Sequence, residues 1–379
     1  MSEPRLQLQP ERIDLKRADD PRDVVHRTVA SLAQGEGVVI AVDGLVGLAA
    51  NALHPEAVHR LRQSPLADDG PGSPTLLLRG GDEVADWVPG LTPLGTRLAR
   101  RAWPGLVTLI YPVPGGPSLL QRLPAEVGSY LRQDGRVALL VPPHPFIRDV
   151  LRLLPGPVVF RPLARVGASD PSPIESIGEE SGFSLIIESN PGASGQEVTV
   201  VRVDPEAWSV VRQGSVDQET LNRMAGTIFL FVCTGNTCRS PMAEAICKVL
   251  LAERLGCTVG ELESRGFVVL SAGIAAVSGM PAASYAIEVV RARGGSLADH
   301  SSRKLTLDLV RHADAILAMT GDHLEALLEH VPEVAPRTRL LHPEGHDVAD
   351  PVGADRDTYQ RTAHAIENYL TRLLDSLGL

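Results

Sequence analysis

Short apolar runs separated by polar and glycine-containing segments recur along the chain. In the C-terminal part these runs predict buried strands, because a brief apolar run flanked by turn residues is typical of a parallel sheet. They lie at residues 228–232, 266–273, 315–320 and 339–341. Apolar positions at helical spacing predict helices at residues 242–255, 282–293, 309–312, 323–329 and 358–374. This alternation favours a doubly wound parallel sheet with helices on both faces.

The N-terminal part alternates less regularly. Helical spacing predicts a helix over residues 24–35, and residues 44–52 are interpreted as a loop running into a helix. Apolar runs predict strands at residues 37–43, 75–79, 103–111 (after a turn), 136–142, 155–160 and 184–188. The fold class is therefore α/β with two domains: a mixed α/β domain at residues 1–224 and a doubly wound domain at residues 225–379.

The most informative segment follows the strand at residues 228–232. We call residues 233–240 the cysteine loop. It begins with Cys233, turns at Gly235 and Asn236, and leads into a helical pattern. Ser240 is expected at the N-cap, with Pro241 at the first helical position. A strand, a tight loop and a helix N-terminus place successive backbone N–H groups around an anion.

The loop also carries a nucleophile and a cation. Amide dipoles at a helix N-terminus favour a thiolate, which is the reactive form of cysteine. The planar guanidinium of Arg239 matches two phosphoryl oxygens. Together they predict covalent catalysis through a phosphocysteine on Cys233. The alternative is a structural cysteine beside a surface arginine, and the strand before the loop and the helix signal after it argue against that alternative.

Residues 232–244 resemble the signature of the low-molecular-weight protein tyrosine phosphatase family, and more closely its protein-arginine phosphatase branch. The resemblance implies that Cys233 and Arg239 are catalytic and that Asp350, before Pro351, is the general acid. It implies phosphate binding by Thr234, Gly235, Asn236, Thr237, Cys238 and Ser240. It also implies support from Ser271, as a partner of Asn236, and from His300.

The resemblance leaves two substrates open. Thr237 stands where the tyrosine-directed branch commonly has a bulkier apolar residue, and Val352 and Gly353 replace an aromatic clamp after Asp-Pro. We therefore rank phosphoarginine first and phosphotyrosine close behind. Cys238 either packs in the interior or closes a reversible disulfide with Cys233.

Roughly residues 18–220 resemble the threonylcarbamoyl-AMP synthase (YrdC-like) family, at residues 47–52, 103–109, 137–145, 198–203 and 210–214. Leu140 replaces an arginine of that family, residues 62–64 read Arg-Gln-Ser where it has Lys-x-Arg, and its Ser-Ala-Asn motif is not recognisable in residues 160–169. A nucleotide site needs fixed cations around the phosphates. We therefore interpret this domain as catalytically degenerate. The alternative is a nucleotide- or tRNA-related function, with the phosphatase domain accessory.

The amino-acid composition limits the classes of binding partner that we expect. A net charge of −10 and 4% aromatic residues argue against a general nucleic-acid surface. Double-stranded RNA or tRNA could bind only through the N-terminal domain and is not favoured; the expected partner is a phosphorylated protein.

The four cysteines lack metal-site spacing, so no metal or cofactor is expected. No apolar run is long enough for a membrane span, and a cytoplasmic location is expected.

Overall fold

The structure is a computed structural model, and it describes residues 10–113, 115–163, 174, 183–189 and 197–379. The turn that composition predicts at residues 190–195 lies outside these ranges. The chain divides into two compact units, Met1–Met224 and Ala225–Leu379. Each unit is described by itself.

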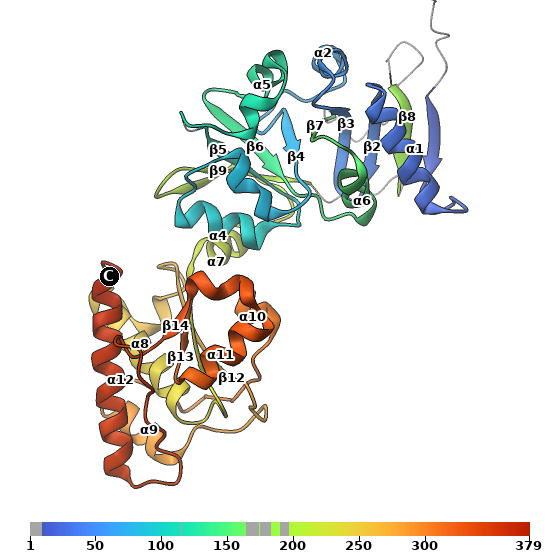
Figure 1. Ribbon diagram of the computed structural model, residues 1–379. Helices are drawn as coiled ribbons and strands as arrows, with labels where there is room; N and C mark the ends of the chain where they lie inside the picture. The colour runs from blue at the N-terminus through green and yellow to red at the C-terminus, as the bar shows by residue number, and fades with distance from the viewer. Residues whose placement is uncertain (1–9, 114, 164–173, 175–182, 190–196) are drawn as a thin grey trace, which may run out of the picture. The chain divides into compact units, whose positions relative to one another are not determined.

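The N-terminal unit is built on one ten-stranded sheet that mixes parallel and antiparallel pairs, in the order β1-β8-β2-β3-β7-β4-β6-β5-β9-β10 (Figure 1). Its strands are β1 (Glu11–Asp14), β2 (Gly37–Val42), β3 (Leu45–Asn51), β4 (Thr75–Leu77), β5 (Val107–Pro112), β6 (Arg136–Leu140), β7 (Val158–Pro162), β8 (Phe183–Glu188), β9 (Thr199–Val203) and β10 (Trp208–Arg212). Its α-helices are α1 (Pro21–Ala33), α2 (Pro55–Gln63), α3 (Val84–Trp87), α4 (Pro93–Ala102), α5 (Ala125–Leu131), α6 (Pro145–Leu153) and α7 (Gln218–Ala225), which ends at the unit boundary. The predicted mixed α/β class is confirmed.

One element of this unit was predicted wrongly. Residues 45–51 form strand β3, not a loop running into a helix, and β3 pairs antiparallel with β2. Asp43 and Gly44 both have positive φ (26° and 81°), the backbone that a tight hairpin turn requires. Gly47 lies so close to β7 that a Cβ would be 2.3 Å from the Arg161 carbonyl oxygen. Small residues in this strand therefore serve close packing.

The C-terminal unit has a four-stranded parallel sheet in the order β12-β11-β13-β14. The strands are β11 (Thr227–Cys233), β12 (Phe267–Gly273), β13 (Ala315–Ala318) and β14 (Thr338–Leu340). The α-helices are α8 (Arg239–Leu255), α9 (Ser284–Arg291), α10 (Leu307–His312), α11 (Gly321–His330) and α12 (Arg356–Ser376). This is the doubly wound arrangement predicted from the sequence.

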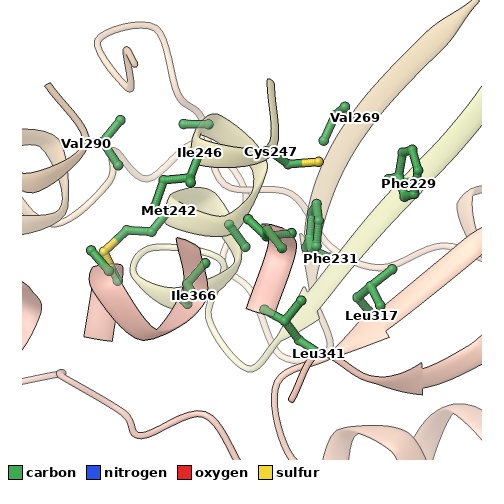
Figure 2. Packing of buried hydrophobic residues seen from close by; sticks show 14 of the residues in the cluster. Phe229, Phe231, Met242, Ile246, Cys247, Val269, Val290, Leu317, Leu341 and Ile366 are labelled. Carbon is green, nitrogen blue, oxygen red and sulfur yellow. The ribbon is translucent and has the colours of Figure 1, made fainter. Parts of the chain in front are cut away.

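Alternate residues of the central strand β11 supply two separate cores. Phe229 and Phe231 face helices α8, α9 and α12, where Met242 and Ile366 pack against the sheet (Figure 2). Leu230 and Val232 face the other layer, formed with α10 and α11. Burial on both faces fixes the register of β11, because a one-residue slip would exchange the two sets of side chains. The carboxyl end of this strand, where Cys233 lies, is therefore held firmly.

Candidate active site

The cysteine loop begins where β11 ends and stops where α8 starts. Asn236 has a φ of 54°, the left-handed conformation that asparagine tolerates better than most residues. The end of β12 packs directly against this turn. A Cβ on Gly273 would lie 2.6 Å from the Thr234 carbonyl oxygen and 2.9 Å from the Asn236 nitrogen, so the approach requires glycine.

The start of helix α8 differs from the prediction. The N-cap is Cys238, which makes no capping hydrogen bond with its side chain, and Ser240 lies inside the first turn. The Ser240 hydroxyl instead contacts Cys233 and Asn236, so it is used by the loop and not by the helix end. Pro241 also fits the first turn, because the backbone donors there have no partner within the helix.

The Cys233 thiol is 3% exposed and has two polar neighbours. Its Sγ lies 2.9 Å from the Ser240 Oγ, and the Asn236 backbone N–H donates to it at 3.3 Å. Both contacts come from within the cysteine loop. Two of the predicted phosphate-binding residues, Asn236 and Ser240, therefore contact the sulfur of the predicted nucleophile.

The Asn236 side chain holds the loop together. Its amide nitrogen donates to the Ser240 Oγ at 3.0 Å and to the Ser271 Oγ at 2.8 Å. Its amide oxygen accepts from the Arg303 backbone N–H at 2.9 Å. The His300 Nε2 lies 2.8 Å from the Asn236 carbonyl oxygen and donates to it. Ser271 and His300, predicted as supporting residues, therefore both contact Asn236.

Arg239 reaches from the first position of α8 toward the loop that precedes α12. Its Nη2 lies 2.5 Å from the Asp350 Oδ2, and its Nη1 donates to the Val348 carbonyl oxygen at 3.3 Å. The Arg239 side chain is 7% exposed, whereas that of Asp350 is 45% exposed. A second anchor fixes this loop, since the Val348 N–H donates to the Met319 carbonyl oxygen. Asp350 therefore stands at the solvent side of the guanidinium.

Two contacts were missed from the sequence, and both involve the predicted phosphate-binding residues. The buried His323 lies with its Nε2 2.9 Å from the Thr234 Oγ1 and its Nδ1 2.7 Å from the Thr320 Oγ1. Burial, and then the charge of Arg239, lower the pKa of His323. Thr320 is the N-cap of α11, and that threonine before a helical pattern was a readable signal. Nothing in the pattern singled out His323.

The second missed contact involves Cys238. Its Sγ lies 3.2 Å from the Tyr359 hydroxyl of α12 and 3.7 Å from the Thr237 Oγ1. Burial, and then the hydrogen bond to Cys238, raise the pKa of Tyr359, so its phenol stays protonated at neutral pH. Cys233 and Cys238 are both free thiols.

The remaining buried cysteine lies outside the cysteine loop, on helix α8. Cys247 is fully buried, and desolvation raises its pKa to about 12. Within the described residues, no group of three or more His, Cys, Asp or Glu side chains could hold a metal ion. Among the same residues, no helix is both long and apolar enough to cross a membrane.

Comparison with known proteins assigns both parts of the chain. Residues 228–378 match the family described as low molecular weight phosphotyrosine protein phosphatase. Residues 30–214 match the Sua5/YciO/YrdC family, which is described as telomere recombination. Both resemblances predicted from the sequence are confirmed.

Relatives of the C-terminal unit are aligned over most of their length. A protein-arginine-phosphatase from Geobacillus stearothermophilus is 34% identical over 155 residues, covering 39% of this chain and 94% of that relative. One from Bacillus subtilis is 36% identical over 152 residues, covering 39% and 95%. The low molecular weight protein-tyrosine-phosphatase Etp of Escherichia coli K12 is 35% identical over 140 residues, covering 36% and 86%. Through residues 228–378, this chain belongs to the low molecular weight phosphotyrosine protein phosphatase family.

Proposed function

We propose that this chain is a cysteine-dependent protein phosphatase that works through a phosphocysteine on Cys233. The observation that carries the proposal is the Arg239–Asp350 ion pair, whose arginine lies at the end of the same loop that begins with Cys233. The buried Cys233 thiol ends β11, the Arg239 guanidinium begins α8, and the Asp350 carboxyl group precedes α12 and contacts Arg239 at 2.5 Å. A nucleophile, an anion-binding cation and a proton donor are what phosphoryl transfer without a metal needs.

The reaction has two steps in this proposal. The Cys233 sulfur attacks phosphorus and forms an S–P bond, while the bond to the leaving nitrogen or oxygen breaks and Asp350 gives that atom a proton. Water then attacks phosphorus, Asp350 takes a proton from the water, and the S–P bond breaks to release phosphate. Throughout, Arg239 and the loop N–H groups hold the equatorial oxygens.

We rank phosphoarginine ahead of phosphotyrosine as the substrate. Two of the aligned relatives are named protein-arginine-phosphatases. Val352, next to the Asp-Pro pair, is 65% exposed and offers no aromatic face for a phenyl ring. Thr237 is half-buried at the cysteine loop, where its hydroxyl can meet a guanidino group.

The test compares the purified chain with Cys233→Ser in hydrolysis of p-nitrophenyl phosphate in the presence of a chelator. We expect turnover only by the parent chain, and a cysteine-linked phosphate after acid quench. Phosphoarginine and phosphotyrosine peptides of matched sequence then decide the substrate from their kcat/KM ratio. Metal-dependent turnover, or turnover that survives Cys233→Ser, would sink the proposal.

For the N-terminal unit we propose a retained scaffold without nucleotide chemistry. Leu140 ends β6 at 1% exposure, so its place in the sheet supplies no cation. Arg62 is turned to the ring of Tyr130, with its Cζ 5.4 Å from the ring centroid. Residues 164–169, part of the region where the Ser-Ala-Asn motif was sought, lie outside the described residues. Adenylate formation from ATP, threonine and bicarbonate would overturn this part of the proposal.

A further inference from the structure

The buried hydrogen bonds around the cysteine loop continue to a carboxylate that the proposed reaction does not use. The Ser271 Oγ donates to the Glu244 Oε2 at 2.6 Å, and the Glu244 Oε1 pairs with the Lys248 Nζ at 2.5 Å. Glu244 lies on α8 and is only 7% exposed. A continuous polar path therefore runs from the Cys233 sulfur to a charged pair.

The direction of every hydrogen bond on this path follows from the groups at its middle. The Arg303 backbone N–H can only donate, so the Asn236 atom facing it is the amide oxygen. The Asn236 amide nitrogen must then face Ser240 and Ser271 and donate to both. Each serine oxygen accepts from Asn236, so each hydroxyl hydrogen points elsewhere.

The two remaining hydrogens have one partner each. The Ser240 hydroxyl therefore donates its hydrogen to the Cys233 sulfur, with the Oγ 2.9 Å from the Sγ. That of Ser271 goes to Glu244, because an ionised carboxylate only accepts. Ser271 is fully buried, so without Glu244 its hydrogen would lose a charged acceptor that water does not replace. Charge-assisted hydrogen bonds are also the stronger ones, and they polarise their neighbours.

We propose that Glu244 is a positioning residue for the nucleophile: acting through Ser271 and Asn236, it keeps the Ser240 hydroxyl aimed at the Cys233 sulfur. The proposal rests on the proposed function only in taking Cys233 as the nucleophile. Glu244 touches neither the thiol nor the expected phosphate position. Lys248, 33% exposed at its side chain, keeps the carboxylate paired.

The experiment reads the thiol directly. Full-length protein is alkylated with iodoacetamide from pH 5 to 8, and modification at Cys233 is followed by fragment-ion mass spectrometry. At pH values below the midpoint of the curve of alkylation rate against pH, Glu244→Ala should slow alkylation by roughly three- to tenfold, the scale of the net contribution of one ordinary hydrogen bond. Glu244→Gln, whose amide oxygen still accepts from Ser271, should recover most of the rate. Glu367→Ala is the matched control, because Glu367 pairs with Arg293 away from this path.

A double-mutant cycle separates positioning from simple stability. If Glu244 acts through Ser271, Glu244→Ala should add no further slowing in a Ser271→Ala background. Equal slowing in both backgrounds, or a lowered melting temperature with an unchanged alkylation profile, overturns the proposal. Because alkylation needs no turnover, these outcomes are distinct from a failure of the phosphatase assay with Cys233→Ser.

Discussion

The Arg239 guanidinium and the Asp350 carboxylate lie 2.5 Å apart, so the proposed phosphate-binding cation and the proposed general acid are paired to each other. A substrate phosphate must share Arg239 with this carboxylate. Binding of the substrate phosphate to Arg239 would release Asp350 from this ion pair, so that its carboxyl group could turn to the leaving group. The pair therefore links substrate binding to placement of the acid.

The first prediction concerns Asp350→Asn. Loss of the proton donor should lower kcat by about 10²- to 10⁴-fold, the usual range for general acid catalysis. Inhibition by inorganic phosphate should become tighter, because Arg239 loses its anionic competitor. Steady-state kinetics with phosphate as a competitive inhibitor measures both effects.

Asp347→Asn is the control for that experiment. Asp347 is a nearby carboxylate that accepts from the Gly321 backbone N–H at 2.8 Å and makes no described contact with Arg239. It should leave both quantities close to the parent values. Weaker phosphate binding by Asp350→Asn would contradict the competition argument.

The second prediction concerns Gly273→Ala. The added Cβ would press on the backbone of Thr234 and Asn236 at 2.6 and 2.9 Å, and backbone atoms cannot move as a flexible side chain can. We expect kcat/KM to fall at least roughly tenfold, because small misplacement of a catalytic group is costly. Gly260→Ala, where nothing lies within 4 Å, is the control. Parent-like activity of Gly273→Ala would show that the loop tolerates displacement.

Much of the fold and of the candidate site could be predicted from the sequence, and the reasons differ by element. The strand ending at Cys233 was predictable because an apolar run buried on both faces is distinctive. Strand β3 could not be predicted in the same way. Gly47 and the alanines after it are small residues that permit close contact between strands, and in the sequence such residues favour a loop or a helix. Ser240 was misplaced as a helix cap because sequence spacing cannot show that its hydroxyl faces the loop.

The polar contacts of the site were the least predictable. His323 and Tyr359 contact the cysteine loop from helices α11 and α12, and Glu244 of α8 contacts Ser271, which in turn contacts the loop; only the fold brings these partners together. Each occupies a position that helical periodicity alone explains. Their chemistry depends on partners distant in sequence.

The third prediction concerns substrate choice. Thr237→Ile removes a hydroxyl and adds apolar bulk, so the ratio of kcat/KM for phosphoarginine over phosphotyrosine peptides should fall by roughly tenfold. Thr234→Val serves as the comparison, since it removes a loop hydroxyl that is hydrogen-bonded to His323. It should lower kcat/KM for both substrates by the same factor. An unchanged ratio in Thr237→Ile would remove Thr237 from the substrate argument.

The last prediction concerns pH and His323. Burial, and then Arg239, lower the pKa of His323 from its ordinary value of 6.5, although Asp322, Asp347 and Asp350 oppose the shift. Well above pH 6.5 the imidazole is neutral in both folded and unfolded chains and contributes no pH dependence. Below it, the unfolded chain takes up the proton first, so stability should decline until the pH passes the folded value.

Heat inactivation checks this, with samples heated at pH 7.5 or 5.5 and assayed afterwards at one common pH. All three tryptophans precede residue 225, so tryptophan fluorescence would report the wrong unit and activity is the better probe. Between pH 7.5 and pH 5.5, the midpoint temperature of heat inactivation should fall less in His323→Gln than in the parent chain. His364→Gln, on the exposed side of α12, should keep the full drop. Equal drops in the parent chain and His323→Gln would mean that protonation of His323 is not what destabilises this site in acid.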